Sequence, residues 1–232
     1  MAIAHFLQQN VSYCKIFINF VRLYVYMNAL GKISKFIAVL CAAIVVVACN
    51  NDTDTVLTQQ QTSIEKYLTT SHQPRLMEES TIGSSTLPEP PFYTRWDMDI
   101  YRYISTYYEE GRDEKAEIVK GTTFDIIYTA YIFTGSDPKV ADMYATNDET
   151  SLKQLQDLGL NTSFEWTTEP MRLTLGKSAM IEGLRVALEG CREGDSVEVY
   201  MTFAAAYGKN YIGKVPTKSS VVWKVNIVDI VD

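Results

Sequence analysis

The chain has 232 residues with 28 acidic and 21 basic side chains, so its formal net charge is −7 at pH 7. Residues 1–49 contain no Asp or Glu and hold four of the basic groups, which leaves a strongly acidic remainder. Such a remainder argues against nucleic acid as a partner, because phosphates are bound through Lys and Arg. The two histidines, His5 and His72, lie in the first half. We therefore expect no metal, no cofactor and no histidine-based catalytic triad in the second half.

The N-terminal segment has the pattern of a targeting signal. Lys32 and Lys35 precede an unbroken apolar run over residues 36–49. A membrane-spanning helix needs about 20 apolar residues, whereas a shorter run after positive charges is typical of a secretory signal. Residues 46–49, Val-Val-Ala-Cys, resemble a bacterial lipobox and are followed at once by polar residues. We predict an upstream extension over 1–26, a lipoprotein signal peptide over 27–48, and lipid attachment at Cys49.

Two alternatives remain for this segment. The apolar run is also compatible with an ordinary membrane-anchor helix in which Cys49 is incidental. Residues 1–26 are also compatible with a second short membrane segment.

Residues 49–94 are expected to connect this segment to a folded domain. Residues 50–56 are polar and predict a tether. Residues 57–70 predict a short helix whose weak apolar face contains Leu57, Ile64, Tyr67 and Leu68. Residues 71–91 hold four of the seven prolines and many Ser and Thr, which favours an extended linker.

From about Phe92 the pattern indicates β-strands. Apolar and polar residues alternate over residues 171–175, 197–203 and 221–227, and β-prone runs cover 100–108 and 122–133. Alternation with period two predicts strands with one buried face, as in an antiparallel sheet. A charged turn containing Gly111 separates the first two runs.

Two helical patterns interrupt the strands. The first covers residues 149–158, with Gly159 placed as a C-terminal cap, and the second covers 181–189, followed by Gly190. An antiparallel sheet packed on one short helix predicts an α+β domain. The apolar stripe of the first helix is expected to pack on the sheet edge, with binding of a partner as the alternative.

A series of short motifs follows in a recognisable order. They are Leu175-Gly176-Lys177, Ile181-Glu182-Gly183-Leu184, Ala187-Leu188-Glu189-Gly190, Gly194-Asp195, Ala206-Tyr207-Gly208, Val215-Pro216, Ser219 and Trp223. This order resembles the FKBP-type peptidyl-prolyl isomerase family. The resemblance implies an FKBP-like domain over residues 95–231, with a curved antiparallel sheet wrapped on the short helix and a helical insertion at about 136–163.

The resemblance also implies an apolar substrate pocket. The family's catalytic positions fall on Tyr207, Ile181 and Tyr128, with the Ile181 backbone N–H and the Tyr207 hydroxyl holding substrate carbonyls. Its substrate-binding positions fall on Met171, Met180, Leu184, Val215 and Trp223. Cys191, just after the helix, is expected to be a buried, inert thiol, since free cysteine packs as a small hydrophobic residue.

The sequence departs from the family at several positions. Leu184 stands where the pocket floor is usually Trp, Met171 where an aromatic residue is usual, and Lys214 where the flap is apolar. The family's Phe-Asp pair corresponds either to Phe164-Glu165 or to the region of Tyr144-Ala145.

The resemblance implies a monomeric prolyl isomerase that acts on proline-containing peptides or unfolded envelope proteins. Together with the signal, it predicts attachment to a bacterial membrane through lipid at Cys49, on the periplasmic or surface face. One alternative is a non-catalytic FKBP-like peptide-binding or chaperone module. Another is a purely structural envelope lipoprotein.

Overall fold

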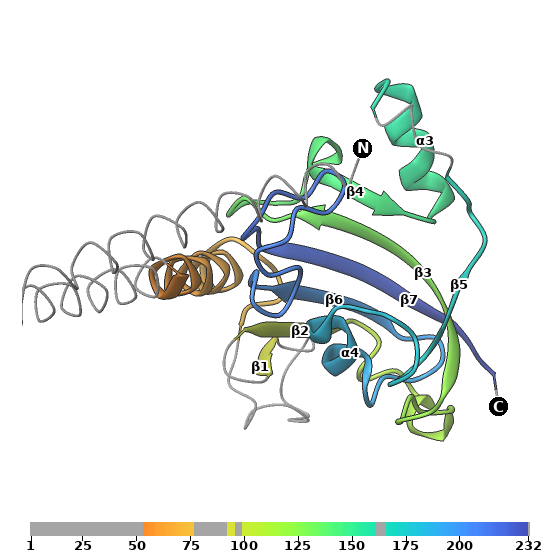
Figure 1. The fold of residues 1–232 in the computed structure, drawn as a ribbon. Coiled ribbons are helices and arrows are strands. Elements are labelled where there is room, and N and C mark those ends of the chain that lie inside the picture. The colour runs from red at the N-terminus through yellow and green to blue at the C-terminus, as the bar shows by residue number, and fades with distance from the viewer. Residues whose placement is uncertain (1–52, 77–91, 96–98, 161–165, 232) are drawn as a thin grey trace, which may run out of the picture. The chain divides into compact units, whose positions relative to one another are not determined.

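One antiparallel sheet organises the part of the chain that the computed structural model describes, namely residues 53–76, 92–95, 99–160 and 166–231 (Figure 1). Its strands are β1 (Tyr93–Arg95), β2 (Ile100–Ile104), β3 (Thr123–Ile132), β4 (Met143–Thr146), β5 (Met171–Thr174), β6 (Ser196–Met201) and β7 (Val221–Val231). They run in the order β1-β2-β6-β7-β3-β4, and β5 pairs with the start of β3. The predicted α+β class and the antiparallel sheet are confirmed.

Contacts divide the chain into two compact units, Met1–Asp54 and Thr55–Asp232. The predicted extension, signal peptide and lipidation site at Cys49 lie outside the described residues, as do most of the Pro-rich segment and Phe164-Glu165. Among the residues described, no helix is both long and apolar enough to cross a membrane.

The main core lies between one face of the sheet and helix α4 (Glu182–Leu188). The alternating positions predicted for β6 and β7 supply it, including Val197, Val199, Val225 and Ile227, which are at most 2% exposed. Burying each aliphatic side chain of this kind contributes about 1.5–3 kcal/mol. The predicted period-two pattern thus marks the face that packs on α4.

The opposite face of the sheet carries a second core, which the sequence did not predict. Residues 53–70 are helical, and Ile64, Tyr67 and Leu68 of this helix pack against Tyr200 and Val222 of the sheet. The helix therefore includes residues 53–56, which were expected to be a tether. Thr55–Asp232 forms one compact unit, which includes this helix from Thr55 onward.

Helix α3 (Glu149–Asp157) occupies the predicted insertion and lies beyond β4 at the edge of the sheet (Figure 1). Asp148 caps its N-terminus by accepting a hydrogen bond from the Ser151 amide at 2.8 Å. Gly159 follows its C-terminal residue with φ +64°, the left-handed conformation that glycine adopts readily. Leu152 and Leu155 are buried. Leu158, the third residue of the predicted apolar stripe, is 63% exposed, so only part of the stripe is buried, and its packing on the sheet edge stays a prediction.

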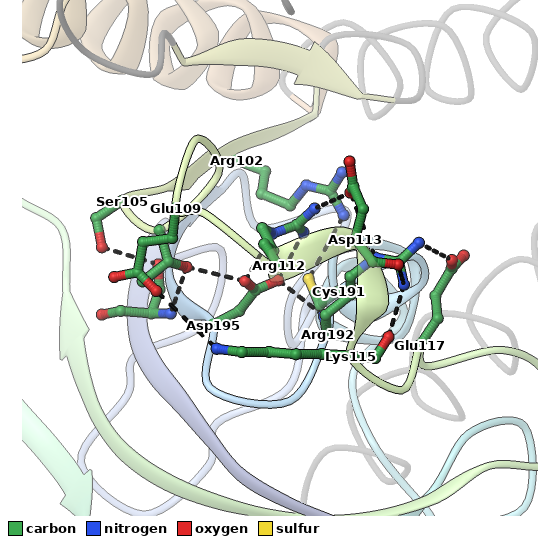
Figure 2. A network of polar contacts seen from close by, with 12 residues as sticks. Arg102, Ser105, Glu109, Arg112, Asp113, Lys115, Glu117, Cys191, Arg192 and Asp195 are labelled. Carbon is green, nitrogen blue, oxygen red and sulfur yellow. Dashed lines mark hydrogen bonds and ion pairs between the residues drawn. The ribbon is translucent and has the colours of Figure 1, made fainter.

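A buried polar network ties the turn after β2 to the segment after α4 (Figure 2). The guanidinium of Arg112, in the short 3-10 helix η2 (Arg112–Glu114), donates two hydrogen bonds to Asp195 at 2.8 and 2.7 Å. Burial opposes the charge of Arg112, but the hydrogen bonds to Asp195 outweigh it and raise the pKa of Arg112. Asp195, of the predicted Gly-Asp motif, thus joins the segment after α4 to η2.

Arg102 of β2 holds the C-terminal end of α4. Its Nη1 donates to the carbonyls of Ala187 and Glu189 at 2.8 and 2.9 Å, which are among the groups that a helix end leaves unpaired. The same nitrogen lies 3.7 Å from the sulfur of Cys191, which is fully buried. The predicted burial of Cys191 is confirmed.

Candidate functional site

An apolar cavity of about 540 Å³ opens between α4, the sheet and the loop that follows β6. Its lining contains six of the eight predicted pocket residues. The full lining is Met171, Leu173, Ala179, Met180, Ile181, Glu182, Leu184, Ala206, Tyr207, Asn210 and Trp223. The motif order therefore identified a set of residues that the fold brings together.

The floor of this cavity is buried and its rim is more exposed. Leu184, in the first turn of α4, and Trp223, on β7, are 2% and 7% exposed, so each presents only a small part of its surface. Met171, Met180 and Tyr207 are half-buried. Ile181 precedes α4 and caps it in an extended conformation. Among the described residues, the Ile181 backbone N–H has no hydrogen-bond partner, which leaves it available to a ligand carbonyl.

Gly183 allows α4 to approach the sheet closely enough to form this floor. Its amide donates to the Ala205 carbonyl at 2.8 Å. A Cβ at this position would lie 2.9 Å from that carbonyl oxygen and 2.5 Å from the sulfur of Met201. Only glycine fits here without a backbone shift, which explains the Glu-Gly-Leu sequence at the start of the helix.

Tyr144 of β4 is hydrogen-bonded to two residues of the cavity lining, Trp223 and Tyr207. The indole N–H of Trp223 donates to the Tyr144 hydroxyl at 2.7 Å, and the hydroxyls of Tyr144 and Tyr207 lie 3.2 Å apart. Burial raises the pKa of both tyrosines, so both hydroxyls remain protonated near neutral pH and can donate. The region of Tyr144 was one of two expected locations of the Phe-Asp pair, but the hydroxyl bridge was not predicted.

Tyr128 and Val215 differ from the prediction. Tyr128 stacks on Trp223 with ring centroids 4.7 Å apart and lies on the wall of a neighbouring cavity instead of the first one. Val215 has no exposed surface, packs in the main core and lines neither cavity. A motif gives the position of a residue in the chain, but the depth of its side chain depends on the residues packed over it.

The neighbouring cavity measures about 770 Å³ and shares Met171 and Tyr207 with the first. Four of its fifteen lining residues come from the predicted insertion. The lining is Tyr128, Tyr144, Ala145, Thr146, Asn147, Trp166, Thr167, Glu169, Pro170, Met171, Tyr207, Tyr211, Ile212, Gly213 and Lys214. No described residue of the insertion appears in the lining of the first cavity.

Asn147 ties the insertion to β3. Its side-chain oxygen accepts from the Tyr128 amide at 2.6 Å, and its nitrogen donates to the carbonyls of Ile126 and Glu169 at 2.9 and 3.0 Å. Lys214 connects the insertion to the loop that follows β6, because its ammonium donates to the Ala141 carbonyl at 3.1 Å. Neither contact follows from a local pattern, since each joins residues far apart in the chain.

The described residues contain no group of three or more His, Cys, Asp or Glu side chains that could hold a metal ion. The lining of the first cavity is an apolar surface with a few directed donors. Such a surface binds an apolar ring and orients the carbonyls beside it.

One protein-family model matches part of the chain. Residues 149–228, less than half of the chain, match the family model for FKBP-type peptidyl-prolyl cis-trans isomerases. The N-terminal domain of FKBP42 from Arabidopsis thaliana is 20% identical, with a TM-score of 0.40, over 59% of this chain and 89% of that chain.

The structure of the three FKBP domains of wheat FKBP73 is 18% identical, with a TM-score of 0.42, over 58% of this chain and 47% of that chain. No curated protein matches the chain. The matched residues include α4, β6 and most of β7 together with Tyr207, so this part of the chain carries an FKBP-type domain.

Proposed function

We propose that the protein is a peptidyl-prolyl cis-trans isomerase. The observation that carries this proposal is the apolar cavity over Leu184 and Trp223, with the Tyr207 hydroxyl at its edge. Rotation about an X–Pro bond takes tens to hundreds of seconds, behind a barrier of about 18–20 kcal/mol that reflects lost amide resonance. A twisted amide is less dipolar than a planar one, so an apolar cavity favours it and lowers the barrier.

In this proposal the cavity residues have distinct roles. Met180, Ile181, Leu184 and Trp223 enclose the proline ring. The Ile181 backbone N–H and the Tyr207 hydroxyl hold the carbonyls beside it. This mechanism needs binding and exclusion of water, and it needs no nucleophile or proton transfer.

The neighbouring cavity supports a peptide substrate over a small isolated ligand. It shares Met171 and Tyr207 with the proline cavity. A chain whose proline ring occupies the first cavity has room to continue into the second. We therefore propose proline-containing peptides or unfolded chains as the substrates.

The test is an isomerase assay on the full chain in mild detergent, with a proline-containing peptide or a protein whose refolding is limited by proline isomerisation. We expect acceleration that Tyr207→Phe lowers about tenfold, equivalent to about 1.4 kcal/mol in the barrier. Tyr108→Phe is the matched control, since Tyr108 is 41% exposed and lines neither cavity. A folded wild-type protein that accelerates neither reaction would refute the proposal.

A non-catalytic peptide-binding or chaperone module is the second candidate. Its supporting observation is that the Tyr207 hydroxyl is already paired with Tyr144, which also accepts from Trp223. A substrate must compete with this pairing. Under this alternative the protein suppresses aggregation of an unfolded client, and Tyr207→Phe leaves that suppression unchanged.

We also propose that the protein is attached to a bacterial cell envelope by lipid at Cys49. The support is the sequence pattern alone. Multiple acyl chains give durable membrane attachment. Mass spectrometry of the mature N-terminus tests this directly: a diacylglyceryl group on Cys49 supports the proposal, and an unmodified Cys49 in membrane fractions contradicts it.

A further inference from the structure

The loop of residues 203–218, here called the site loop, carries Tyr207 between β6 and β7. Its two ends are held by one side chain from the helix of residues 53–70. The Phe203 amide donates to the Gln60 side-chain oxygen at 2.8 Å. The Gln60 side-chain nitrogen donates to the Lys218 carbonyl at 2.7 Å. Gln60 therefore closes the base of the site loop from outside the FKBP-matched residues.

The same two residues also hold the turn next to Tyr207. The Phe203 carbonyl accepts from the Gly208 amide at 2.7 Å and from the Ala206 amide at 3.2 Å. The Gly208 carbonyl accepts from the Lys218 amide at 3.0 Å. Hydrogen bonds thus run from Gln60 to Phe203, on to Gly208, to Lys218 and back to Gln60. Tyr207 immediately precedes Gly208, which is one of the residues joined by these hydrogen bonds.

The site loop is also joined to α4, because the Ala205 carbonyl accepts from the Gly183 amide. A shift of the loop base would therefore disturb both the Tyr207 hydroxyl and the start of the helix that carries Ile181. Phe203 is 4% exposed, so its amide has little access to water as a replacement partner. Leaving a buried amide unpaired costs free energy, which would drive the loop to rearrange.

We propose that Gln60 is a positioning residue for Tyr207, acting through the hydrogen bonds at the base of the site loop. The proposal rests on the proposed role of Tyr207 in substrate binding. It assigns to the helix of residues 53–70 a part in the site that the family match does not include. Gln60 itself does not line the cavity and touches no substrate.

The experiment compares Gln60→Met with Gln59→Met in the full chain in mild detergent. Methionine keeps the length of the side chain and the helix propensity but removes both hydrogen bonds. Gln59 is exposed on the same helix, so its variant is the matched control. We expect trypsin to cut after Lys209 or Lys214 of the site loop about fivefold faster in Gln60→Met, because local opening governs cleavage. Equal cleavage rates in the two folded variants would overturn the proposal.

Activity gives the second readout. We expect Gln60→Met to lower kcat/KM about tenfold in the wild-type background, but at most about twofold in a Tyr207→Phe background, because coupled residues are not additive. The same fold-loss in both backgrounds would show that Gln60 does not act through Tyr207. If the wild-type protein is inactive, the proposed function fails, and the cleavage comparison alone decides whether Gln60 holds the loop.

A third variant keeps the proposal testable if Gln60→Met misfolds, which circular dichroism would reveal. Gln60→Glu keeps an acceptor for the Phe203 amide and loses the donor to the Lys218 carbonyl. We expect cleavage of the site loop and kcat/KM that lie between those of the wild type and Gln60→Met. If the cleavage rate and kcat/KM of Gln60→Glu equal those of the wild type, the proposal that both hydrogen bonds are needed is refuted.

Discussion

Replacing Asp195 by Asn should remove the charge partner of a buried guanidinium. The Asp195 side chain is 1% exposed and that of Arg112 is 7% exposed. The Asp195 carboxylate accepts two hydrogen bonds from Arg112, one from the Thr106 hydroxyl at 2.8 Å and one from the Arg192 amide at 2.7 Å. An Asn side chain has one acceptor oxygen, and its NH₂ group would face donors that need an acceptor.

Breaking a buried ion pair by removing one partner typically costs about 3–5 kcal/mol, since the remaining charge is left uncompensated. We expect a loss of this size for Asp195→Asn in urea unfolding of the full chain, followed by circular dichroism. Asp113→Asn is the matched control, because Asp113 lies 3.8 Å from the same guanidinium but is 93% exposed. Exposed ion pairs contribute little, so its unfolding midpoint should not move.

Two results would refute this reasoning. One is a loss below about 1 kcal/mol for Asp195→Asn, which would mean that water or another acceptor replaces the carboxylate. The other is an equal loss in both variants, which would mean that the burial of Asp195 does not decide the effect.

Three further predictions concern the site and the second core. Gly183→Ala should lower both the thermal midpoint and isomerase activity, because its Cβ would meet the Ala205 carbonyl; unchanged values would contradict the close approach. Tyr144→Phe should cost about 1–3 kcal/mol in urea unfolding, because it leaves the buried Trp223 N–H unpaired; a neutral effect would show that the bond is dispensable. Burial alone lowers the pKa of His72, but its hydrogen bonds, first to Glu198, outweigh this and raise it. The free energy of unfolding should therefore fall as the pH rises from the ordinary pKa of histidine through the raised pKa of His72. The His72→Gln variant should not show this fall.

Local patterns in the sequence predicted much of the fold. The period-two alternation in β6 and β7 identified the residues that pack on α4, since side chains of a strand alternate between faces. Helix α3 was predicted to within one residue, because helical spacing of its leucines and the glycine cap at Gly159 are local signals. The motif order placed Met180, Ile181 and Leu184 at one cavity.

Contacts between distant residues were not predictable in this way. The helix of residues 53–70 looked only weakly amphipathic, yet it covers the second face of the sheet, because Tyr200 and Val222 present apolar surface to it. The hydroxyl bridge at Tyr144 and the loop contact of Gln60 each depend on a partner more than 60 residues away. No local period encodes such pairs.

The sequence by itself determined which residues could form strands, helices and an apolar cavity, because these follow from local spacing and from the order of short motifs. Only the tertiary structure decided how deeply each of them is buried and which cavity it lines. It buried Val215, turned Tyr128 toward a second cavity and closed the loop of Tyr207 with Gln60. The physical reason is that exposure and hydrogen bonding depend on what packs across each residue, and that partner comes from elsewhere in the chain.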